Sequence, residues 1–199
     1  ETHCHLDYLD REQLELTLSK SQAVGVERIV TIAVSRDNQQ LVRDIAETYD
    51  QVWCTQGLHP HEAASWDKDF DAELQASALH DRVLAIGEIG LDYYYEHADA
   101  QTQLAAFEGQ LNIAADCGKP VVIHTREAEA DTKHVLGNLA RQLPQKGVIH
   151  SFTSSMDLAE FCLAEGFYLG FNGIATFKNA ENVREVIRQT PLERILLET

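Results

Sequence analysis

The N-terminal segment Thr2-His3-Cys4-His5 contains two histidines separated by one residue. Side chains alternate across a β-strand, so in a strand His3 and His5 would lie on one face and Cys4 on the other. Two imidazoles would then share a site, and imidazole is a common ligand for transition metals. The alternative is a pair of partly exposed histidines near the end of the chain, and this motif alone does not distinguish the two.

Three more residues with metal-binding side chains lie at the ends of apolar runs: Glu88 in Ile86-Gly87-Glu88-Ile89-Gly90, His124 after the run 121–123, and His150 after the run 147–149. A buried carboxylate or imidazole is costly unless it is paired or binds a metal. Each residue alone could be a hydrogen-bonded core group. Together, several strand ends that converge on one place favour a metal site.

A set of histidines with one carboxylate offers nitrogen and oxygen ligands, which suits zinc, manganese, iron or, less well, magnesium. Glu88 has two oxygens and could bridge two ions, with His3 and His5 on one side and His124 and His150 on the other. Two neighbouring ions can stabilise both the attacking and the leaving oxygen of a displacement, with metal-bound water as the nucleophile. The residues therefore predict a centre that activates water and leave the metal open.

The motif Gly57-Leu58-His59-Pro60-His61 follows another apolar run. Proline ends the strand and restricts the preceding His59 to an extended conformation, so both histidines are expected over the site. They could contact substrate, transfer a proton or bind phosphate. For both histidines the alternative is a place in an ordinary polar loop. A functional role is favoured more strongly for His61 than for His59.

Residues beside Glu88 and His124 could complete the site. Arg126 has a planar cation suited to phosphate or carboxylate, and its alternative is a salt bridge to a nearby acidic residue. Asp92 could orient a ligand histidine, which metal-bound histidines usually require. Tyr93 begins three consecutive tyrosines that could stack on a base or sugar, or could pack the loop down.

The elements that must position these residues form a βαβα pattern. Amphipathic helical segments are clearest at 11–24, 37–49, 100–117 and 156–166. They alternate with eight runs that we expect to be strands: 1–5, 28–34, 52–58, 83–89, 120–124, 147–151, 167–171 and 194–198. Eight strands favour an α/β fold of the (β/α)8 TIM-barrel type over an open doubly wound sheet, and a barrel places its active site at the carboxyl ends of its strands.

Composition limits the function further. The 199 residues include 16 Lys and Arg against 32 Asp and Glu, a net charge of −16, and 44% are hydrophobic. This predicts one folded domain, 1–199, and excludes a disordered chain and a generic basic nucleic-acid binder. We see neither a membrane-length apolar run nor a signal peptide, so we expect a cytoplasmic protein. The four cysteines form no C-x-x-C pair and are expected to be reduced.

Taken together, these motifs resemble those of the TatD family of metal-dependent hydrolases, and the resemblance runs in order along the whole chain. They are Thr-His-Cys-His-Leu-Asp at 2–7, Gly-Leu-His-Pro-His at 57–61, Gly-Glu-Ile-Gly-Leu-Asp-Tyr-Tyr at 87–94, Pro-Val-Val-Ile-His-Thr-Arg at 120–126, Ile-His-Ser-Phe at 149–152, Gly-Ile-Ala-Thr-Phe at 173–177 and Leu-Leu-Glu-Thr at 196–199.

The resemblance implies an amidohydrolase-like TIM barrel with two divalent ions, magnesium, manganese or zinc. It implies that His3 and His5 bind one ion, that Glu88 bridges, and that His124 and His150 bind the other. It further implies that His61 lies close to the metals and the phosphate and that Arg126 holds substrate. The implied activity is that of a deoxyribonuclease, often a 3′ to 5′ exonuclease on single-stranded DNA.

The family motif continues Glu-Thr-Asp, whereas this sequence ends at Thr199. We therefore expect a barrel that ends after its eighth strand, without the last loop and helix and without one carboxylate ligand. The negative charge favours recognition of DNA ends in the mouth of the barrel, with neither a membrane nor an obligate protein partner. The alternatives are a hydrolase of small amides, lactones or phosphoesters and a metal-binding protein without turnover.

Overall fold

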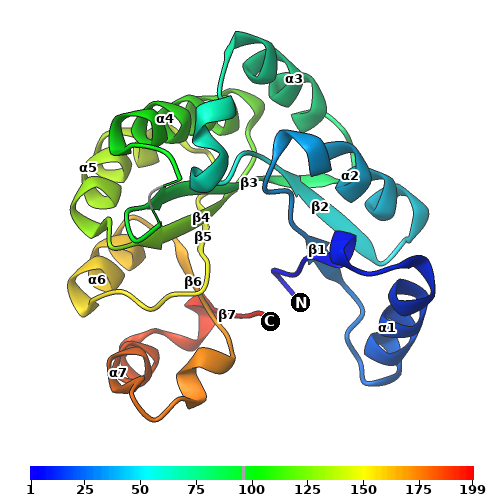
Figure 1. Cartoon of the computed structure of the whole chain (residues 1–199). Coiled ribbons are helices and arrows are strands. Elements are labelled where there is room, and N and C mark those ends of the chain that lie inside the picture. Colours follow the sequence, from blue (N-terminus) through cyan, green and yellow to red (C-terminus); the bar gives the residue numbers. More distant parts are fainter. Residues whose placement is uncertain (96) are drawn as a thin grey trace.

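A computed structural model describes residues 1–95 and 97–199, and it contains one curled, wholly parallel sheet (Figure 1). Neighbouring strands in the sheet are also neighbours in the sequence, in the order β1 to β7. The strands are β1 Ile29–Thr31, β2 Val52–Gln56, β3 Val83–Asp92, β4 Val121–Arg126, β5 Gly147–Ile149, β6 Tyr168–Phe171 and β7 Ile195–Leu197.

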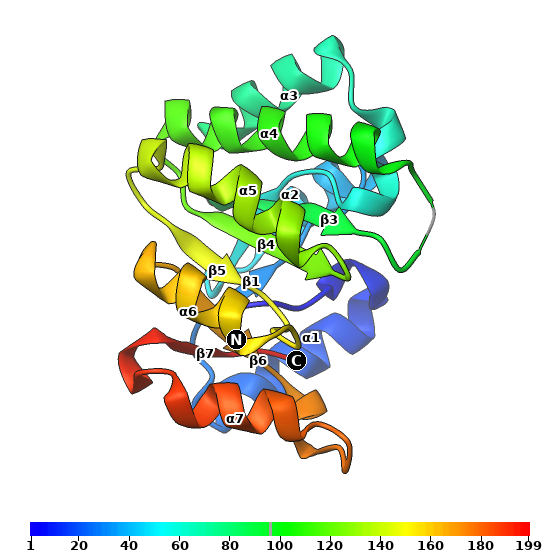
Figure 2. The same ribbon diagram turned by 90° about the vertical axis from the view of Figure 1, so that its left-hand side faces the viewer.

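Each connection between strands passes through a helix, as parallel neighbours require. The helices are α1 Arg11–Ala23, α2 Gln39–Thr48, α3 Lys68–Ala78, α4 Ala100–Cys117, α5 Glu129–Leu139, α6 Met156–Ala164 and α7 Glu181–Gln189. Their starts follow local sequence signals, because Asp10, Asp67, Asp99 and Ser155 each accept a hydrogen bond from a backbone N–H in the first turn. The helices lie on the outside of the sheet (Figures 1 and 2).

This architecture confirms the TIM-barrel fold, but the prediction of a first strand at 1–5 is wrong. The described residues form seven strands, and the N-terminal segment makes only an isolated bridge between Cys4 and Thr31. The extended segment is too short for a strand because the 3-10 turn η1 (Leu6–Tyr8) begins directly after His5.

The N-terminal segment nevertheless lies between the two edges of the sheet. Cys4 donates its backbone N–H to Val30 in β1, at 3.2 Å. On the other side, the Thr2 hydroxyl donates to the carbonyl of Leu197 in β7, at 3.0 Å. Both chain ends accordingly lie close together in Figure 1. Backbone hydrogen bonds to β1, without a regular strand of the sheet, thus bring the histidines of this segment to the barrel.

Glycines allow β3 and β4 to approach each other closely. Gly90 has a φ of +134°, and a Cβ there would overlap the His124 carbonyl. A Cβ at Gly87 would lie 2.7 Å from the Cβ of Val122. Glu88, which lies between these glycines, is therefore held against the strand that carries His124.

The core lies mainly between the helices and the outer face of the sheet. It includes the fully buried rings of Phe70, Phe107, Phe152 and Phe167. A smaller cluster of Ala85, Val122 and Val148 lies apart from this core, along a cleft of about 540 Å³. Burial of the strands against the helices explains the apolar runs from which the strands were predicted. The four cysteines are free thiols. None of the described helices is both long and apolar enough to cross a bilayer.

Candidate metal centre at the mouth of the barrel

The carboxylate of Glu88 lies at the centre of a cluster of histidines from different loops and strand ends. Glu88 is 3% exposed. Its Oε2 lies 3.3 Å from His3 Nε2, and its Oε1 lies 2.7 Å from His150 Nε2, 3.1 Å from His124 Nδ1 and 3.4 Å from His59 Nε2. Segments separated by more than one hundred residues thus supply one site.

The electrostatics of this cluster keep Glu88 ionised. Burial alone would raise the pKa of Glu88, but the charge of His150 and the hydrogen bonds from His124, His150 and His3 hold the pKa well below its usual value. Burial acts in the opposite direction on His150 and would lower its pKa, yet Glu88 and Glu198 raise that pKa to about 10. Burial lowers the pKa of His3 and of His59. A buried anion therefore faces imidazoles of which some are neutral and able to bind a cation.

The donor atoms fit divalent metal ions. His3, Glu88 and His150 form one group, and His59, Glu88 and His124 form a second, with the ligand atoms of each group within 4.8 Å of one another. Ligands around a zinc ion with bonds of about 2.1 Å lie up to about 4.2 Å apart, so small side-chain shifts would suffice. Nitrogen and carboxylate ligands suit zinc, manganese or iron. Glu88 belongs to both groups, as a bridging ligand would.

His5 lies beside the cluster and outside both groups. Its ring centroid is 5.3 Å from that of His3 and 5.4 Å from that of Tyr8. His59, for which the sequence predicted a substrate contact, instead lies against Glu88, and its Nδ1 accepts a hydrogen bond from the His61 backbone at 3.1 Å. The binding of an ion by His5, and the division of His3, His5, Glu88, His124 and His150 between two ions, stay predictions.

Asp92 connects two of the histidines. It is 1% exposed, and its Oδ2 lies 2.9 Å from His124 Nε2 and 3.0 Å from His61 Nε2. Its Oδ1 accepts hydrogen bonds from the backbone of Tyr94 and Tyr95, both at 3.0 Å. Burial would raise the pKa of Asp92, but the bonds from His124, Tyr95 and His61 lower it, so the carboxylate stays charged. This geometry can orient the imidazole of His124.

Arg126 lies at the edge of the mouth. With His124, His150, Ser151 and Ile174 it lines a cleft of about 280 Å³. The guanidinium carbon lies 4.0 Å from the ring centroid of Tyr94 and 5.0 Å from that of Tyr95. Within residues 1–95 and 97–199, Arg126 forms no ion pair, so the salt bridge that the sequence allowed is not observed there.

Tyr93 points away from the histidines. Its hydroxyl donates to Asp131 in α5 at 2.7 Å, and its ring packs on the main core. Burial, followed by this hydrogen bond, raises the pKa of Tyr93. The sequence predicted that Tyr93 contacts substrate or a metal ligand. In the structure, Tyr93 instead packs on the core and bonds to Asp131.

Sequence reasoning missed Glu198. This residue is 7% exposed; its Oε1 accepts a hydrogen bond from the backbone of Ser151 and lies 3.7 Å from His150 Nδ1. A side chain at Gly170 would collide with its carboxylate, so the glycine makes room for it. Glu198 follows an apolar strand, as His124 and His150 do, and the same signal could have identified it.

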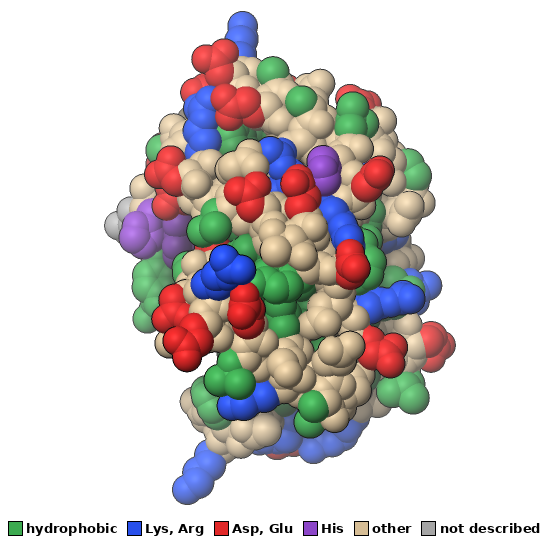
Figure 3. All heavy atoms as spheres, turned by 90° about the vertical axis from the view of Figure 1, so that its right-hand side faces the viewer, with side chains coloured by type: hydrophobic (Ala, Val, Ile, Leu, Met, Phe, Trp, Pro, Cys, Tyr) green, Lys and Arg blue, Asp and Glu red, His purple; other side chains and the backbone are tan. Residues whose placement is uncertain are grey.

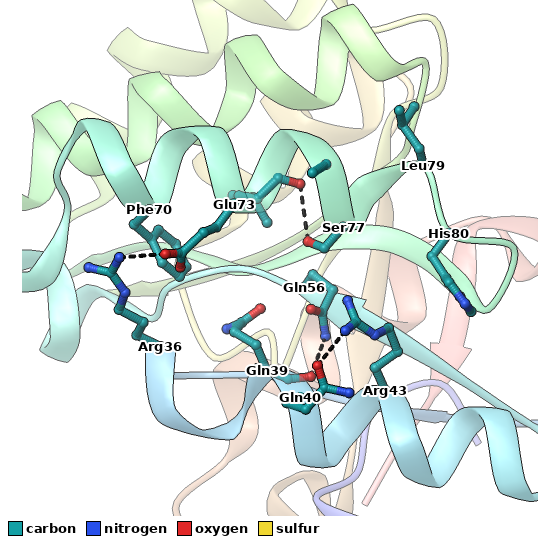
Figure 4. A pocket seen from close by; sticks show the side chains of 12 residues that line it. Arg36, Gln39, Gln40, Arg43, Gln56, Phe70, Glu73, Ser77, Leu79 and His80 are labelled. Atoms are coloured by element: carbon teal, nitrogen blue, oxygen red, sulfur yellow. Dashed lines mark hydrogen bonds and ion pairs between the residues drawn. The ribbon is translucent and has the colours of Figure 1, made fainter.

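A larger cleft lies elsewhere, on the outside of the barrel between α2 and α3 (Figure 4). It measures about 680 Å³. Its charged groups are already paired, with Arg36 Nη2 2.7 Å from Glu73 Oε1, and Gln56 donates to the Gln39 carbonyl. The groups able to hold a metal ion lie at the mouth, not in this cleft.

The chain is similar to known metal-dependent hydrolases. The whole chain, residues 1–199, matches the family described as "TatD related DNase". YcfH of Escherichia coli K12, an uncharacterized metal-dependent hydrolase, is 37% identical over 204 residues, which cover 100% of this chain and 76% of YcfH. Deoxyribonuclease Tat-D of Schizosaccharomyces pombe is 36% identical over 199 residues, which cover 94% of this chain and 63% of that protein.

The fold has a close counterpart among solved structures. The crystal structure of YJJV, a TatD homolog of Escherichia coli K12, matches with a TM-score of 0.91 at 32% sequence identity. The match covers 100% of this chain and 77% of the YJJV chain. The curled sheet is thus part of a TatD-like TIM barrel.

Proposed function

The chain belongs to the TatD-related DNase family of metal-dependent hydrolases, and from this premise we propose that it is a deoxyribonuclease. It hydrolyses phosphodiester bonds at the ends of single-stranded DNA, in the 3′ to 5′ direction. The observation that carries the proposal is the buried Glu88 carboxylate among four imidazoles. Such a charge is costly to bury, and a dinuclear metal site gives it a chemical role.

The same cluster provides places for two divalent ions. His3 and His150 form one group with Glu88, and His59 and His124 form a second group with it, while His5 lies beside His3. Magnesium, manganese and zinc are the candidate ions. When bound, they would activate water and offset the charge on the phosphoryl oxygens. Asp92 and Glu198 keep His124 and His150 in place.

His61 and Arg126 act on the substrate in this proposal. A neutral His61 that donates its Nε2–H to Asp92 leaves Nδ1 as an acceptor, which can take a proton near the reacting phosphate. The Arg126 guanidinium has five N–H donors and is suited to phosphate oxygens. Its position at the cleft beside His124 and His150 supports a contact with the substrate phosphate.

A small phosphoester, lactone or amide is the second candidate substrate. The cleft at the mouth measures only about 280 Å³, and the chain carries a net charge of −16. Both features disfavour long DNA and suit a small or terminal group. The name of the Schizosaccharomyces pombe relative, a deoxyribonuclease, supports DNA as the first choice.

The test is digestion of single-stranded DNA labelled at its 5′ end or its 3′ end, with the full-length protein in Mg²⁺ or Mn²⁺. The proposal expects stepwise shortening from the 3′ end, lost on addition of EDTA. Intact DNA together with hydrolysis of a small ester would replace DNA with the second candidate. Shortening from the 5′ end would reverse the proposed direction.

A further inference from the structure

Exposed aromatic side chains gather at the carboxyl ends of the strands. In the described part of the chain, four aromatic residues are exposed: Tyr8 (73%), Tyr94 (51%), Tyr95 (43%) and Phe177 (58%). All four lie in loops that begin at the mouth: η1, the loop after β3, and the loop after η5 (Gly173–Thr176). The large apolar side chains exposed elsewhere, such as Leu79 and Leu192, are aliphatic. We call these four aromatic residues the aromatic rim.

Two members of the aromatic rim contact histidines that lie at or beside the candidate metal centre. The Tyr8 ring stacks on His5, with centroids 5.4 Å apart and planes at 20°. The Tyr95 ring meets His61 edge to face, with centroids 5.4 Å apart and planes at 78°. In the space-filling view, histidines gather at one edge of the molecule with hydrophobic side chains beside them (Figure 3). The rim therefore continues directly from the proposed reaction site.

Phe177, another member of the aromatic rim, follows the segment that lines the cleft through Ile174. Ile174 lines the cleft at the mouth, and the backbone N–H of Phe177 donates to the Ile174 carbonyl at 3.0 Å. Asn172, at the start of η5, donates to the hydroxyl of Ser151, which also lines the cleft. These bonds fix the backbone of the segment that joins the cleft to Phe177.

Arg126 adds a positive charge to the rim. It stacks over Tyr94 and Tyr95, whose own rings lie edge to face at 4.7 Å. The backbone of both tyrosines is fixed by Asp92, which also holds His61 and His124. A charged group and several planar rings at a rigid mouth suit a ligand that combines phosphate with planar bases. On the face seen in Figure 3, by contrast, basic and acidic side chains are interspersed among the described residues.

We propose that the aromatic rim stacks on unpaired nucleobases next to the phosphate being cleaved, and that the rim therefore makes an oligonucleotide a better substrate than a small phosphodiester. This inference rests on the proposed function. Aromatic side chains stack on every base, so the contacts are tolerant of sequence and need little positive charge. Bases inside a duplex are already stacked and cannot reach the rings. A strand end with unpaired bases is the chemistry that the rim fits.

Phe177 and Tyr8 allow a test, because both are exposed and neither is itself a proposed metal ligand or proton-transfer residue; since Tyr8 stacks on His5, Phe177→Leu alone is assayed beside the double variant. The double variant Phe177→Leu/Tyr8→Leu of the full-length protein removes the rings and keeps apolar side chains. Phe177→Tyr keeps a ring, and Leu79→Ala removes an exposed apolar side chain far from the mouth. Each protein is assayed on a single-stranded oligonucleotide containing 2-aminopurine and on an oligonucleotide of the same length whose nucleotides near the 3′ end lack bases, with the 2-aminopurine fluorescence recorded on binding.

For the double variant, we expect the KM for the oligonucleotide to rise by about 5- to 150-fold for each base that no longer stacks on a ring. We expect the rate on the abasic oligonucleotide to stay within about twofold of wild type, because its cleaved end has no bases to stack. Quenching of 2-aminopurine on binding should weaken in the double variant and persist in Phe177→Tyr and Leu79→Ala.

Two results would overturn the inference: an unchanged oligonucleotide KM in the double variant, or equal losses on both substrates. Failure of the proposed function looks different. In that case the wild-type protein cleaves neither substrate with any divalent ion, while fluorescence quenching that depends on the rings still supports base stacking. Absence of quenching in the wild-type protein counts against the rim whatever the hydrolysis result.

Discussion

The structure adds one residue, Glu198, to the candidate site. Its carboxylate lies behind His150, on the side opposite Glu88, so that His150 is placed between two acidic groups. A carboxylate behind a metal-binding histidine fixes the ring orientation and raises its basicity. We therefore propose that Glu198 acts on His150 rather than on the substrate.

The variant Glu198→Gln should reduce the affinity for Mn²⁺ by about 10- to 100-fold, because Gln keeps the acceptor for Ser151 and loses the charge facing His150. Titration calorimetry with Mn²⁺ measures this change. Glu185→Gln is a matched control, since Glu185 is exposed on α7 and pairs with Arg188. Equal Mn²⁺ affinity in wild type and Glu198→Gln would remove Glu198 from the site.

At the residue scale, a single signal predicted much of the candidate site. Metal-binding side chains at the ends of apolar runs identified Glu88, His124 and His150, and the structure brings these together with His3. The same signal does not show which histidine faces which oxygen. That depends on the turns after β2 and after the N-terminal segment, which bring His59 against Glu88 and turn His5 toward Tyr8.

The elements that matter most to the site are β3 and β4. Their backbones approach closely at Gly90, which lies two residues after Glu88 and pairs with His124 in register. The alternation of apolar runs and helices predicted these two strands. It could not predict the failure of the segment 1–5 to form a strand, because that depends on a turn that begins at Leu6.

Gly90→Ala should destabilise the protein much more than Gly118→Ala. Both glycines have positive φ, +134° and +68°, so both substitutions strain the backbone. A Cβ at Gly90 also overlaps the His124 carbonyl, whereas nothing lies within 4 Å of a Cβ at Gly118. We expect an additional loss of about 1–3 kcal/mol in the free energy of unfolding by urea for Gly90→Ala. Equal losses would show that the strands can separate at no cost.

Tyr93 ties the loop after β3 to α5, and this contact should depend on pH. The pKa of Tyr93 is raised in the folded protein by burial and by the bond to Asp131. In the unfolded chain the phenol ionises near pH 10. The unfolded state therefore loses its proton first, and the stability that this contact contributes is complete below about pH 10 and falls as the pH rises above it.

The comparison of wild type with Tyr93→Phe tests this contact. We expect Tyr93→Phe to lower the free energy of unfolding by about 1 kcal/mol at pH 7. The difference between the two proteins should shrink in denaturant titrations above about pH 10. A difference that stays constant with pH up to the alkaline limit of folding would contradict the role of the hydroxyl.

At the scale of the whole molecule, the net charge of −16 sets how the protein meets DNA. A basic protein that contacts many phosphates loses affinity steeply as salt rises. Here Arg126 is the cation that lines the cleft at the mouth, so about one phosphate contact is expected. Salt also screens the repulsion between DNA and the surrounding acidic groups, and this offsets part of the small loss in affinity.

The KM for a single-stranded oligonucleotide should therefore change by about threefold or less between about 50 and 200 mM salt, as a slope near −0.7 for one contact gives. Steady-state kinetics at constant divalent-ion concentration measure this dependence. A loss of a hundredfold or more would reveal a basic binding surface and would contradict recognition at the mouth alone.

The most direct test of the metal centre combines binding and catalysis in one comparison, wild type against Glu88→Gln. The full-length protein is titrated with Mn²⁺, and hydrolysis of a phosphodiester is followed in the same samples. We expect wild type to bind two ions and to gain activity as they bind, and Glu88→Gln to lose at least one ion and to lose activity by more than about a hundredfold. Phosphodiester hydrolysis by wild type that persists in EDTA, or that survives in Glu88→Gln with unchanged Mn²⁺ binding, would contradict a metal centre built on Glu88.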